Sequence, residues 1–188
     1  MKIAAAILAG GRGKRLGGVD KGLVQIGGEP IVARQLRALA PLVEERLIVA
    51  GDPRPYESFD ARLVVDVHPG AGPLAGIEAA LAAISAEALL VFACDHPFVD
   101  AALIQALRDA EPCDAVVARL DGKAQPLAAR YARSILARVQ RRLQRDQLRL
   151  LDLVAELDPR WIDFAAGTRS LFNVNTPDDL ARAEALLR

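Results

Sequence analysis

The chain has 188 residues, of which 52% are apolar, and its 24 lysines and arginines balance 24 aspartates and glutamates. This length suits one domain with a sizeable apolar core, so we predict a single domain over residues 1–188. We also expect the protein to be a monomer. Balanced charge without a long block of one sign argues against nucleic-acid binding and against an acidic protein partner. The first apolar run, 3–9, is too short to span a membrane and lacks signal-peptide architecture, so we expect a cytoplasmic protein. The cysteines, Cys94 and Cys113, are far apart and form no disulfide framework or zinc cluster, and both are expected to be buried.

Short apolar runs alternate with helical patterns along the first two thirds of the chain. The expected strands are apolar throughout, which is typical of parallel strands covered on both faces, and they span 3–8, 46–50, 63–65, 88–93 and 115–118. Between them, apolar residues recur at three- and four-residue spacing, which predicts helices over 31–42, 74–84 and 100–109. This alternation predicts an α/β fold with a mostly parallel sheet.

The last third of the chain departs from that alternation. A strand pattern at 126–131 follows the turn at 121–123, and such a turn predicts an antiparallel strand at the edge of the sheet. The stretch 134–157 has a helical pattern, and the short segments 161–164 and 171–174 follow it before a last helix. Thr176 is expected to cap that helix and Pro177 to be its first residue.

A glycine-rich, basic loop follows the first expected strand. Ligands of open parallel sheets bind beyond the carboxyl ends of the strands, and Leu8 and Ala9 lead into Gly10 and Gly11 at such an end. Consecutive glycines let backbone N–H groups approach an anion, and positive charge comes from Arg12, Lys14, Arg15 and Lys21. The loop fits neither the Walker pattern nor the Rossmann fingerprint. It therefore predicts a polyphosphate site of another kind, with a flexible basic turn as the alternative.

Two aspartates follow other expected strands at the same edge. Asp95 follows the run 88–93 by two residues. Asp66 directly follows the run 63–65 and precedes a second glycine-rich loop at 70–76. Magnesium in nucleotide sites is held by one or two carboxylates together with phosphate oxygens and water. Asp95 is therefore our predicted magnesium ligand, with a solvated turn beside Pro97 as its alternative.

These residues carry a resemblance to a known family. The stretch Leu8-Ala-Gly-Gly-Arg-Gly-Lys-Arg-Leu-Gly-Gly-Val-Asp-Lys-Gly22 resembles the signature of the nucleotidyltransferases typified by molybdenum cofactor guanylyltransferase. The resemblance continues through Gly72-Pro-Leu-Ala-Gly76, Cys94-Asp-His-Pro97 and Phe172-Asn-Val-Asn-Thr-Pro177, and thus spans nearly the whole chain. It implies a three-layer Rossmann-like fold with a mostly parallel central sheet and an antiparallel edge. It also implies Mg²⁺-dependent transfer of GMP from GTP to the molybdopterin cofactor, with release of pyrophosphate.

The resemblance assigns roles to residues of this chain. The implied GTP-binding residues are Leu8, Ala9, Gly10, Gly11, Lys21, Asp66 and Asp95. The implied catalytic residues are Arg15, Lys21 and Asp95, and the residues near the acceptor are Gln125, Asn173 and Asn175. Relatives that transfer CMP tend to have Leu-Ala-Ala-Gly where this chain has Leu8-Ala-Gly-Gly11, so the glycine pair that ends in Gly11 points to a guanine nucleotide. Transient contact with proteins that supply molybdopterin or mature molybdoenzymes is implied as well.

Two alternatives stay open at this point. One is a related nucleotidyltransferase that uses CTP or a sugar-phosphate acceptor, and the other is a non-catalytic carrier of the finished cofactor. One departure from the family concerns residues 50–52, where several members have an asparagine that contacts the nucleotide and this chain has Ala-Gly-Asp. Backbone contacts, a changed nucleotide preference or substitution by Asp52 would each account for it.

Several other polar residues are expected to have ordinary roles. Asp20 most simply orients Lys21 or caps its turn, and the two histidines, His68 and His96, have no zinc-pair spacing, with His96 expected as a polar loop residue. Arginines fall largely on one side of the helical stretch 134–157 and predict a solvated face, with an anionic-ligand or partner surface as the alternative: Arg138, Arg141, Arg142, Arg145 and Arg149. Trp161 does not interleave with basic residues as a nucleic-acid platform would.

Overall fold

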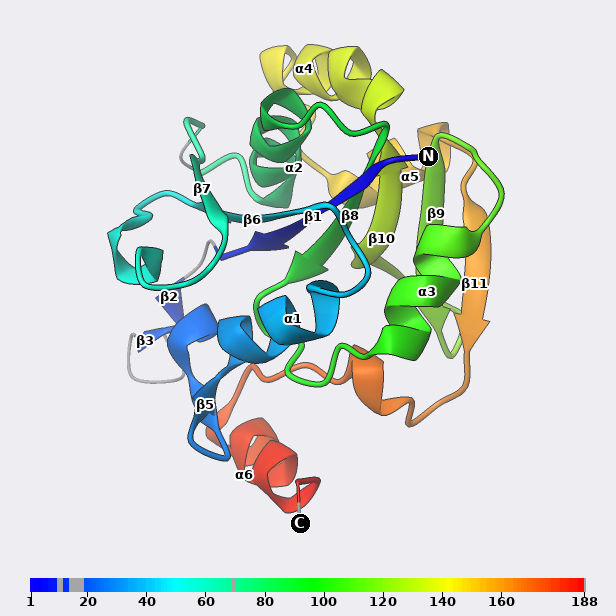
Figure 1. The fold of residues 1–188 in the computed structure, drawn as a ribbon. Coiled ribbons are helices and arrows are strands. Elements are labelled where there is room, and N and C mark those ends of the chain that lie inside the picture. The colour runs from blue at the N-terminus through cyan, green and yellow to red at the C-terminus, as the bar shows by residue number, and fades with distance from the viewer. Residues whose placement is uncertain (10–11, 14–18, 69, 188) are drawn as a thin grey trace.

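The computed structural model describes residues 1–9, 12–13, 19–68 and 70–187. Within these residues the central feature is a seven-stranded sheet (Figure 1). Its strands, in chain order, are β1 (Ile3–Leu8), β6 (Glu45–Ala50), β7 (Arg62–Val65), β8 (Ala88–Ala93), β9 (Ala115–Leu120), β10 (Lys123–Ala132) and β11 (Arg160–Phe164). Across the sheet their order is β11-β9-β10-β8-β1-β6-β7.

The sheet is mostly parallel, as the apolar strand pattern predicted. β1 pairs in parallel with both β6 and β8, and β7 and β11 extend the sheet in parallel with β6 and β9. β10 is antiparallel to both of its neighbours, β8 and β9. The expected antiparallel strand is therefore present, but it has a partner on each side instead of forming the outermost strand. It has that inner place because β9 pairs with its other side, and β11, beyond β9, is the outermost strand.

Helices cover both faces of the sheet and complete the three layers. α1 (Ile31–Leu39) and α3 (Ala101–Asp109) pack on one face, with Ile3, Ala5 and Ile7 of β1. α2 (Pro73–Ala83), α4 (Leu136–Gln144) and α5 (Leu150–Glu156) cover the other face, with Ala4, Ala6 and Leu8. Because successive side chains of a strand point to opposite faces, a strand covered on both sides has to be apolar throughout.

Smaller elements lie below the carboxyl ends of the parallel strands. β4 (Gln25–Ile26) and β5 (Glu29–Pro30) form a hairpin that packs against α6 (Pro177–Ala185) in a separate apolar cluster. β2 (Arg12–Gly13) and β3 (Val19–Asp20) form a two-stranded ribbon beside β1 (Figure 1). Thr176 caps α6 and Pro177 is its first residue, as predicted, and Asp179 completes a capping box.

Three expectations need correction. The helical stretch 134–157 divides into α4 and α5, because Asp146 adopts a left-handed conformation (φ 57°) and Gln147 N–H donates to Arg142 O, an arrangement that ends a helix. Segment 171–174, expected as a short regular segment, contains the last residue of a 3-10 turn (Arg169–Leu171) and then irregular backbone. Cys94 is buried as expected, whereas Cys113 is only partly buried. Among the described residues, no helix has both the length and the apolar character to cross a bilayer.

Candidate active site

A cavity of about 600 Å³ lies at the carboxyl ends of the parallel strands, on the face covered by α2. This volume falls in the usual range of small-molecule sites. Its walls come from the ends of β1, β6 and β8, the loop before α2, and β10: Leu8, Lys21, Val49, Ala50, Gly51, Asp66, Gly70, Gly72, Pro73, Gly76, Ala93, Asp95 and Leu127. Leu8, Lys21, Asp66 and Asp95, which the sequence singled out separately, thus share one cavity.

Glycines let α2 approach this cavity closely. A Cβ at Gly76 would lie 3.2 Å from Leu8 Cδ2, so the absent side chain allows the first turns of α2 to pack against β1. Gly72 precedes the helix with φ +68°, a conformation that residues with a side chain rarely adopt. Gly72 and Pro73, at the start of α2, both line the cavity. The partial positive charge of a helix N-terminus therefore faces the space where an anion would bind.

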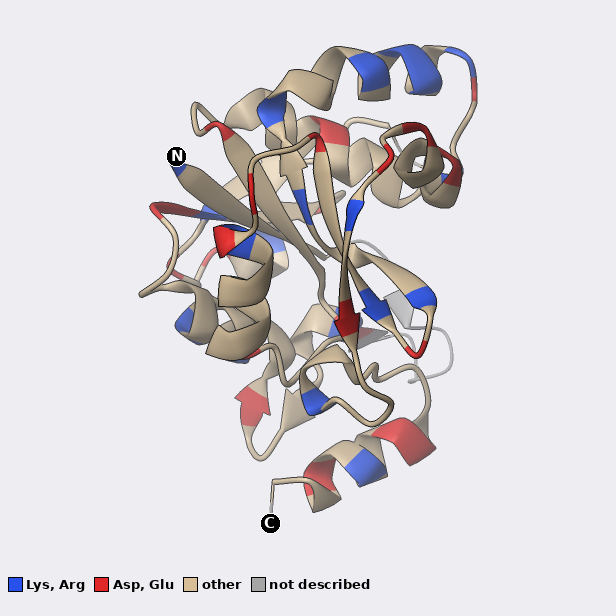
Figure 2. Cartoon of the chain, turned by 90° about the vertical axis from the view of Figure 1, so that its right-hand side faces the viewer, with Lys and Arg blue, Asp and Glu red and all other residues tan. Residues whose placement is uncertain are grey.

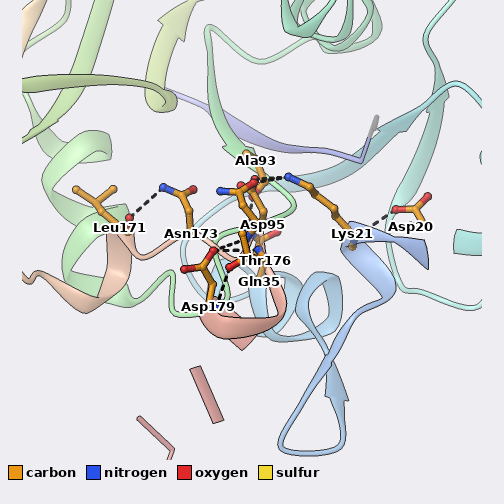
Figure 3. Close-up of polar contacts among 11 residues, drawn as sticks. Asp20, Lys21, Gln35, Ala93, Asp95, Leu171, Asn173, Thr176 and Asp179 are labelled. Atoms are coloured by element: carbon orange, nitrogen blue, oxygen red, sulfur yellow. Dashed lines mark hydrogen bonds and ion pairs between the residues drawn. The ribbon is translucent and has the colours of Figure 1, made fainter. Parts of the chain in front are cut away.

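Lys21 connects two predicted parts of the site (Figure 3). Its Nζ lies 3.2 Å from Asp95 Oδ2 and 2.5 Å from Asn175 Oδ1. The side chains of Lys21 and Asp95 are 24% and 17% exposed, so the ion pair is partly shielded from water. The structure therefore places a predicted phosphate ligand, a predicted metal ligand and a predicted acceptor residue in direct contact.

Asp20 holds the turn on which Lys21 lies. Its carboxylate accepts a hydrogen bond from Gly22 N–H at 3.2 Å and another from the hydroxyl of Tyr56, which is fully buried. Burial, reinforced by the charge of Asp20, raises the pKa of Tyr56, so the phenol keeps its proton and remains a donor. The predicted capping role of Asp20 is confirmed. Tyr56 itself carried no sequence signal, because a tyrosine in a loop is indistinguishable from an exposed one until its partner is known.

Asp95 lies on a turn that directly follows β8. Its backbone oxygen accepts a hydrogen bond from Val174 N–H at 2.9 Å, which ties the turn to the C-terminal segment. His96 lies in the loop after β8, as expected, but it is buried, with 3% of its surface exposed. Burial lowers the pKa of His96, partly offset by the neighbouring Asp95 charge, and favours a neutral imidazole. Asn173 Nδ2 donates to Leu171 O at 3.5 Å.

The departure at residues 50–52 has a structural counterpart. Ala50 and Gly51 line the cavity, and Ala50 O accepts a hydrogen bond from Asp66 N–H at 3.0 Å. Asp52 does not line it. Instead its carboxylate binds the guanidinium of Arg54 at 2.7 and 2.9 Å, which lowers the pKa of Asp52 to about 2. This side chain is therefore occupied elsewhere, and backbone and small side chains form this wall.

This chain is similar to known proteins over most of its length. A family model described as the MobA-like NTP transferase domain matches residues 5–159. The chain belongs to the MobA-like NTP transferase family. A molybdenum cofactor guanylyltransferase from Cereibacter sphaeroides is 35% identical over 100% of this chain and 98% of its own length. One from Pseudomonas paraeruginosa is 34% identical over 96% and 93%.

Solved structures place this MobA-like chain in the same fold. Molybdopterin-guanine dinucleotide biosynthesis protein A from Archaeoglobus fulgidus superimposes with a TM-score of 0.79 at 30% identity, covering 100% of this chain and 98% of the other. A CMP:2-keto-3-deoxy-manno-octonic acid synthetase complexed with CTP gives a TM-score of 0.76 at 18% identity, covering 100% and 98%, and shares the fold. The nucleotidyltransferase fold predicted from the sequence is confirmed.

Some predicted residues of this MobA-like chain lie elsewhere or cannot be placed. Ala9 is buried, and its N–H donates to Val49 O at 2.8 Å. Gln125, near the start of β10, does not line the cavity, and its Nε2 donates to Lys123 O at 3.4 Å. The predictions for Gly10, Gly11 and Arg15 lie outside the described residues.

The arginines of α4 do not share one side of the helix. Figure 2 shows basic residues along this helix at the top of the view. Arg141 and Arg145 are exposed, in agreement with a solvated face. Arg142 is buried and its Nη1 lies 2.5 Å from Glu156 Oε1, across the joint between α4 and α5. This guanidinium therefore fastens two helices together and is not part of an open basic surface.

Proposed function

We propose that this chain transfers GMP from GTP to the molybdopterin cofactor, forming molybdopterin guanine dinucleotide and releasing pyrophosphate. Two full-length relatives that carry the name molybdenum cofactor guanylyltransferase support this activity. The observation that carries it is the position of Lys21, which lines the cavity and whose ammonium contacts both Asp95 and Asn175. One cation thus lies between the proposed nucleotide side and the proposed acceptor side.

The proposed reaction is an in-line displacement at the α-phosphorus of GTP. An oxygen of the acceptor's terminal phosphate forms a new bond to this phosphorus, while its bond to the oxygen bridging the α- and β-phosphates breaks. Pyrophosphate leaves with that electron pair. A phosphate monoester is largely ionised near neutral pH, so the chain needs no strong general base and contributes mainly by positioning the reactants and neutralising charge.

Each described residue has a role in this scheme. Lys21 would neutralise the triphosphate and the departing pyrophosphate, and the N-terminus of α2 would add partial positive charge. Asp66, Ala50 and Gly51 would form the wall on the nucleoside side, where the aspartate and backbone groups supply the polar contacts. Asn175, and Asn173 held by Leu171 O, would orient the acceptor.

The proposed Mg²⁺ fits the donor set. Among the described residues there is no cluster of three or more carboxylate, histidine or cysteine side chains, as a metal cage made by protein alone would need. A single carboxylate, Asp95, on the wall of a polyphosphate cavity is the arrangement in which substrate phosphates and water complete the coordination. Bound there, the ion would neutralise charge on the phosphate oxygens. Asp95 would hold it.

Pyrophosphate release tests the proposal. The chain is incubated with Mg²⁺, molybdopterin cofactor and either GTP or CTP, beside Asp95→Ala and the control Asp60→Ala, whose 93% exposed carboxylate lies on a loop. We expect release with GTP, loss in Asp95→Ala, and no change in Asp60→Ala. Release with CTP alone would overturn the guanine assignment, and tight binding of the dinucleotide without any release would indicate a carrier.

A further inference from the structure

Gln35 is a polar residue in the apolar face of α1. Ile31 and Leu39, one turn before and one turn after it on the helix, are buried, and so is Leu36 beside it. Gln35 itself is 0% exposed. Burying an amide without partners is unfavourable, so the hydrogen bonds that it makes are informative. Here Nε2 is bonded, whereas Oε1 has no partner among the described residues. The partners of Nε2 therefore indicate what the amide does.

The amide of Gln35 binds the turn that carries Asp95. Its Nε2 donates to Ala93 O at 2.8 Å and to His96 O at 2.9 Å, the carbonyls on either side of Asp95 in the chain (Figure 3). The turn's own hydrogen bond, from His96 N–H to Ala93 O, is longer at 3.4 Å. The side chain of a helix in a different layer thus makes the shorter contacts with this turn.

We infer that Gln35 is a positioning residue that fixes the direction of the Asp95 carboxylate. Three anchors hold the turn: Gln35 from α1, Leu8 O, which accepts from Cys94 N–H at 3.2 Å, and Val174 N–H, which donates to Asp95 O at 2.9 Å. Leu8 and Val174 engage the backbone at single points, whereas Gln35 spans the turn from its first to its last residue. Without it, His96 O loses its only hydrogen bond in the described part of the chain.

The same contact links both sides of the site. Asp95 O accepts a hydrogen bond from Val174 N–H at 2.9 Å, and Val174 lies between Asn173 and Asn175. A shift of the turn would therefore move the Asp95 carboxylate relative to Lys21 and move Asn173 with it. The role in catalysis rests on the proposed function, whereas the role in holding the turn rests on the hydrogen bonds alone.

Gln35→Met tests the inference, because methionine has similar length and volume but no donor. Leu36→Met is the matched control, a similar change at a buried position of the same helix whose side chain makes no hydrogen bond to the turn. Outer partners of metal ligands typically contribute 10- to 100-fold to metal affinity or activity. For Gln35→Met with GTP, we expect Mn²⁺ affinity measured by electron paramagnetic resonance to fall about 10-fold or more. Amide hydrogen exchange at Cys94, His96 and Val174 should also accelerate, with little change elsewhere.

Different outcomes separate this inference from the proposed function. Unchanged Mn²⁺ affinity and unchanged amide exchange in Gln35→Met would overturn the inference about Gln35. Equal effects in Leu36→Met would also overturn it, because they would indicate a general loss of stability. If Gln35→Met does not fold, Gln35→Leu provides the same measurement without the donor. If the native chain releases no pyrophosphate, the proposed function fails, yet exchange at the turn still decides whether Gln35 holds it.

Discussion

Replacement of Lys21 by methionine should strengthen metal binding at Asp95 and slow pyrophosphate release. The substitution removes the ammonium and keeps an unbranched apolar stem, so the packing of the turn after β3 should persist. Lys21 Nζ lies 3.2 Å from Asp95 Oδ2. It is thus a cation beside the carboxylate that we propose as the metal ligand, and it competes with any metal for this group.

The size of the change in Mn²⁺ affinity follows from the distance between the Lys21 and Asp95 charges and from the exposure of the two side chains. Two unit charges 3.2 Å apart attract by roughly 5 kcal/mol at an effective dielectric constant of about 20. Both side chains are partly exposed, so screening reduces the usable coupling to about 1 kcal/mol. Without nucleotide, Lys21→Met should therefore bind Mn²⁺ about 5-fold more tightly than the native chain.

Catalysis should change in the opposite direction. Loss of a charged contact to the phosphates should lower the rate of pyrophosphate release by about 10²–10³-fold, equivalent to about 3–4 kcal/mol in the transition state. Lys2→Met, an exposed lysine before β1 at the other end of the strand, is the control and should change neither quantity. Near-normal turnover would refute the assignment of Lys21 to the phosphates. Unchanged or weaker Mn²⁺ binding would refute its competition for Asp95.

Three further substitutions test the surroundings of the site. Tyr56→Phe removes a buried hydrogen bond to the Asp20 carboxylate and should lower the free energy of unfolding by about 1.5–3 kcal/mol in urea titrations. Arg142→Met breaks the ion pair with Glu156 and should lower it by about 1–2 kcal/mol while pyrophosphate release stays unchanged. The pKa of Asp179 lies below its usual value, first because of its hydrogen bond with the Thr176 side chain and then because of backbone N–H groups. This carboxylate therefore stabilises the fold above the unfolded pKa, and that contribution is lost as the pH falls through the folded pKa. Between pH 5 and about 3, Asp179→Asn should consequently lose less stability than the native chain.

Each of these expectations has a contrary result. Equal stability of Tyr56→Phe and the native chain would mean that the phenol does not hold Asp20. A loss of turnover in Arg142→Met at full stability would indicate a ligand surface on α4 instead of a joint between helices. Parallel acid profiles of Asp179→Asn and the native chain would show that the capping box does not perturb this carboxyl group.

The sequence by itself determined the layers of the fold and the edge where the site lies. Runs such as 3–8 and 88–93 are apolar at every position, and only a strand covered on both faces requires this. Glycines and aspartates at the ends of such runs then indicated one edge of the sheet, because parallel strands end together. These features were predictable because each is a local pattern: the apolar residues of a segment show which of its faces are covered.

Only the tertiary structure decided which distant residues meet. Lys21 contacts Asp95 from 74 positions away and Asn175 from 154, and Gln35 reaches carbonyls 58 and 61 positions along the chain. Likewise, the pattern of 126–131 indicated a strand but not that it pairs with β8 on one side and β9 on the other. In sequence Arg142 is indistinguishable from the exposed arginines beside it, and its burial against Glu156 of α5 is visible only in the structure. Apolar periodicity records which face of an element is covered. Which residues meet, and which polar side chains another element buries, depends on strand order and helix packing, which local patterns do not encode.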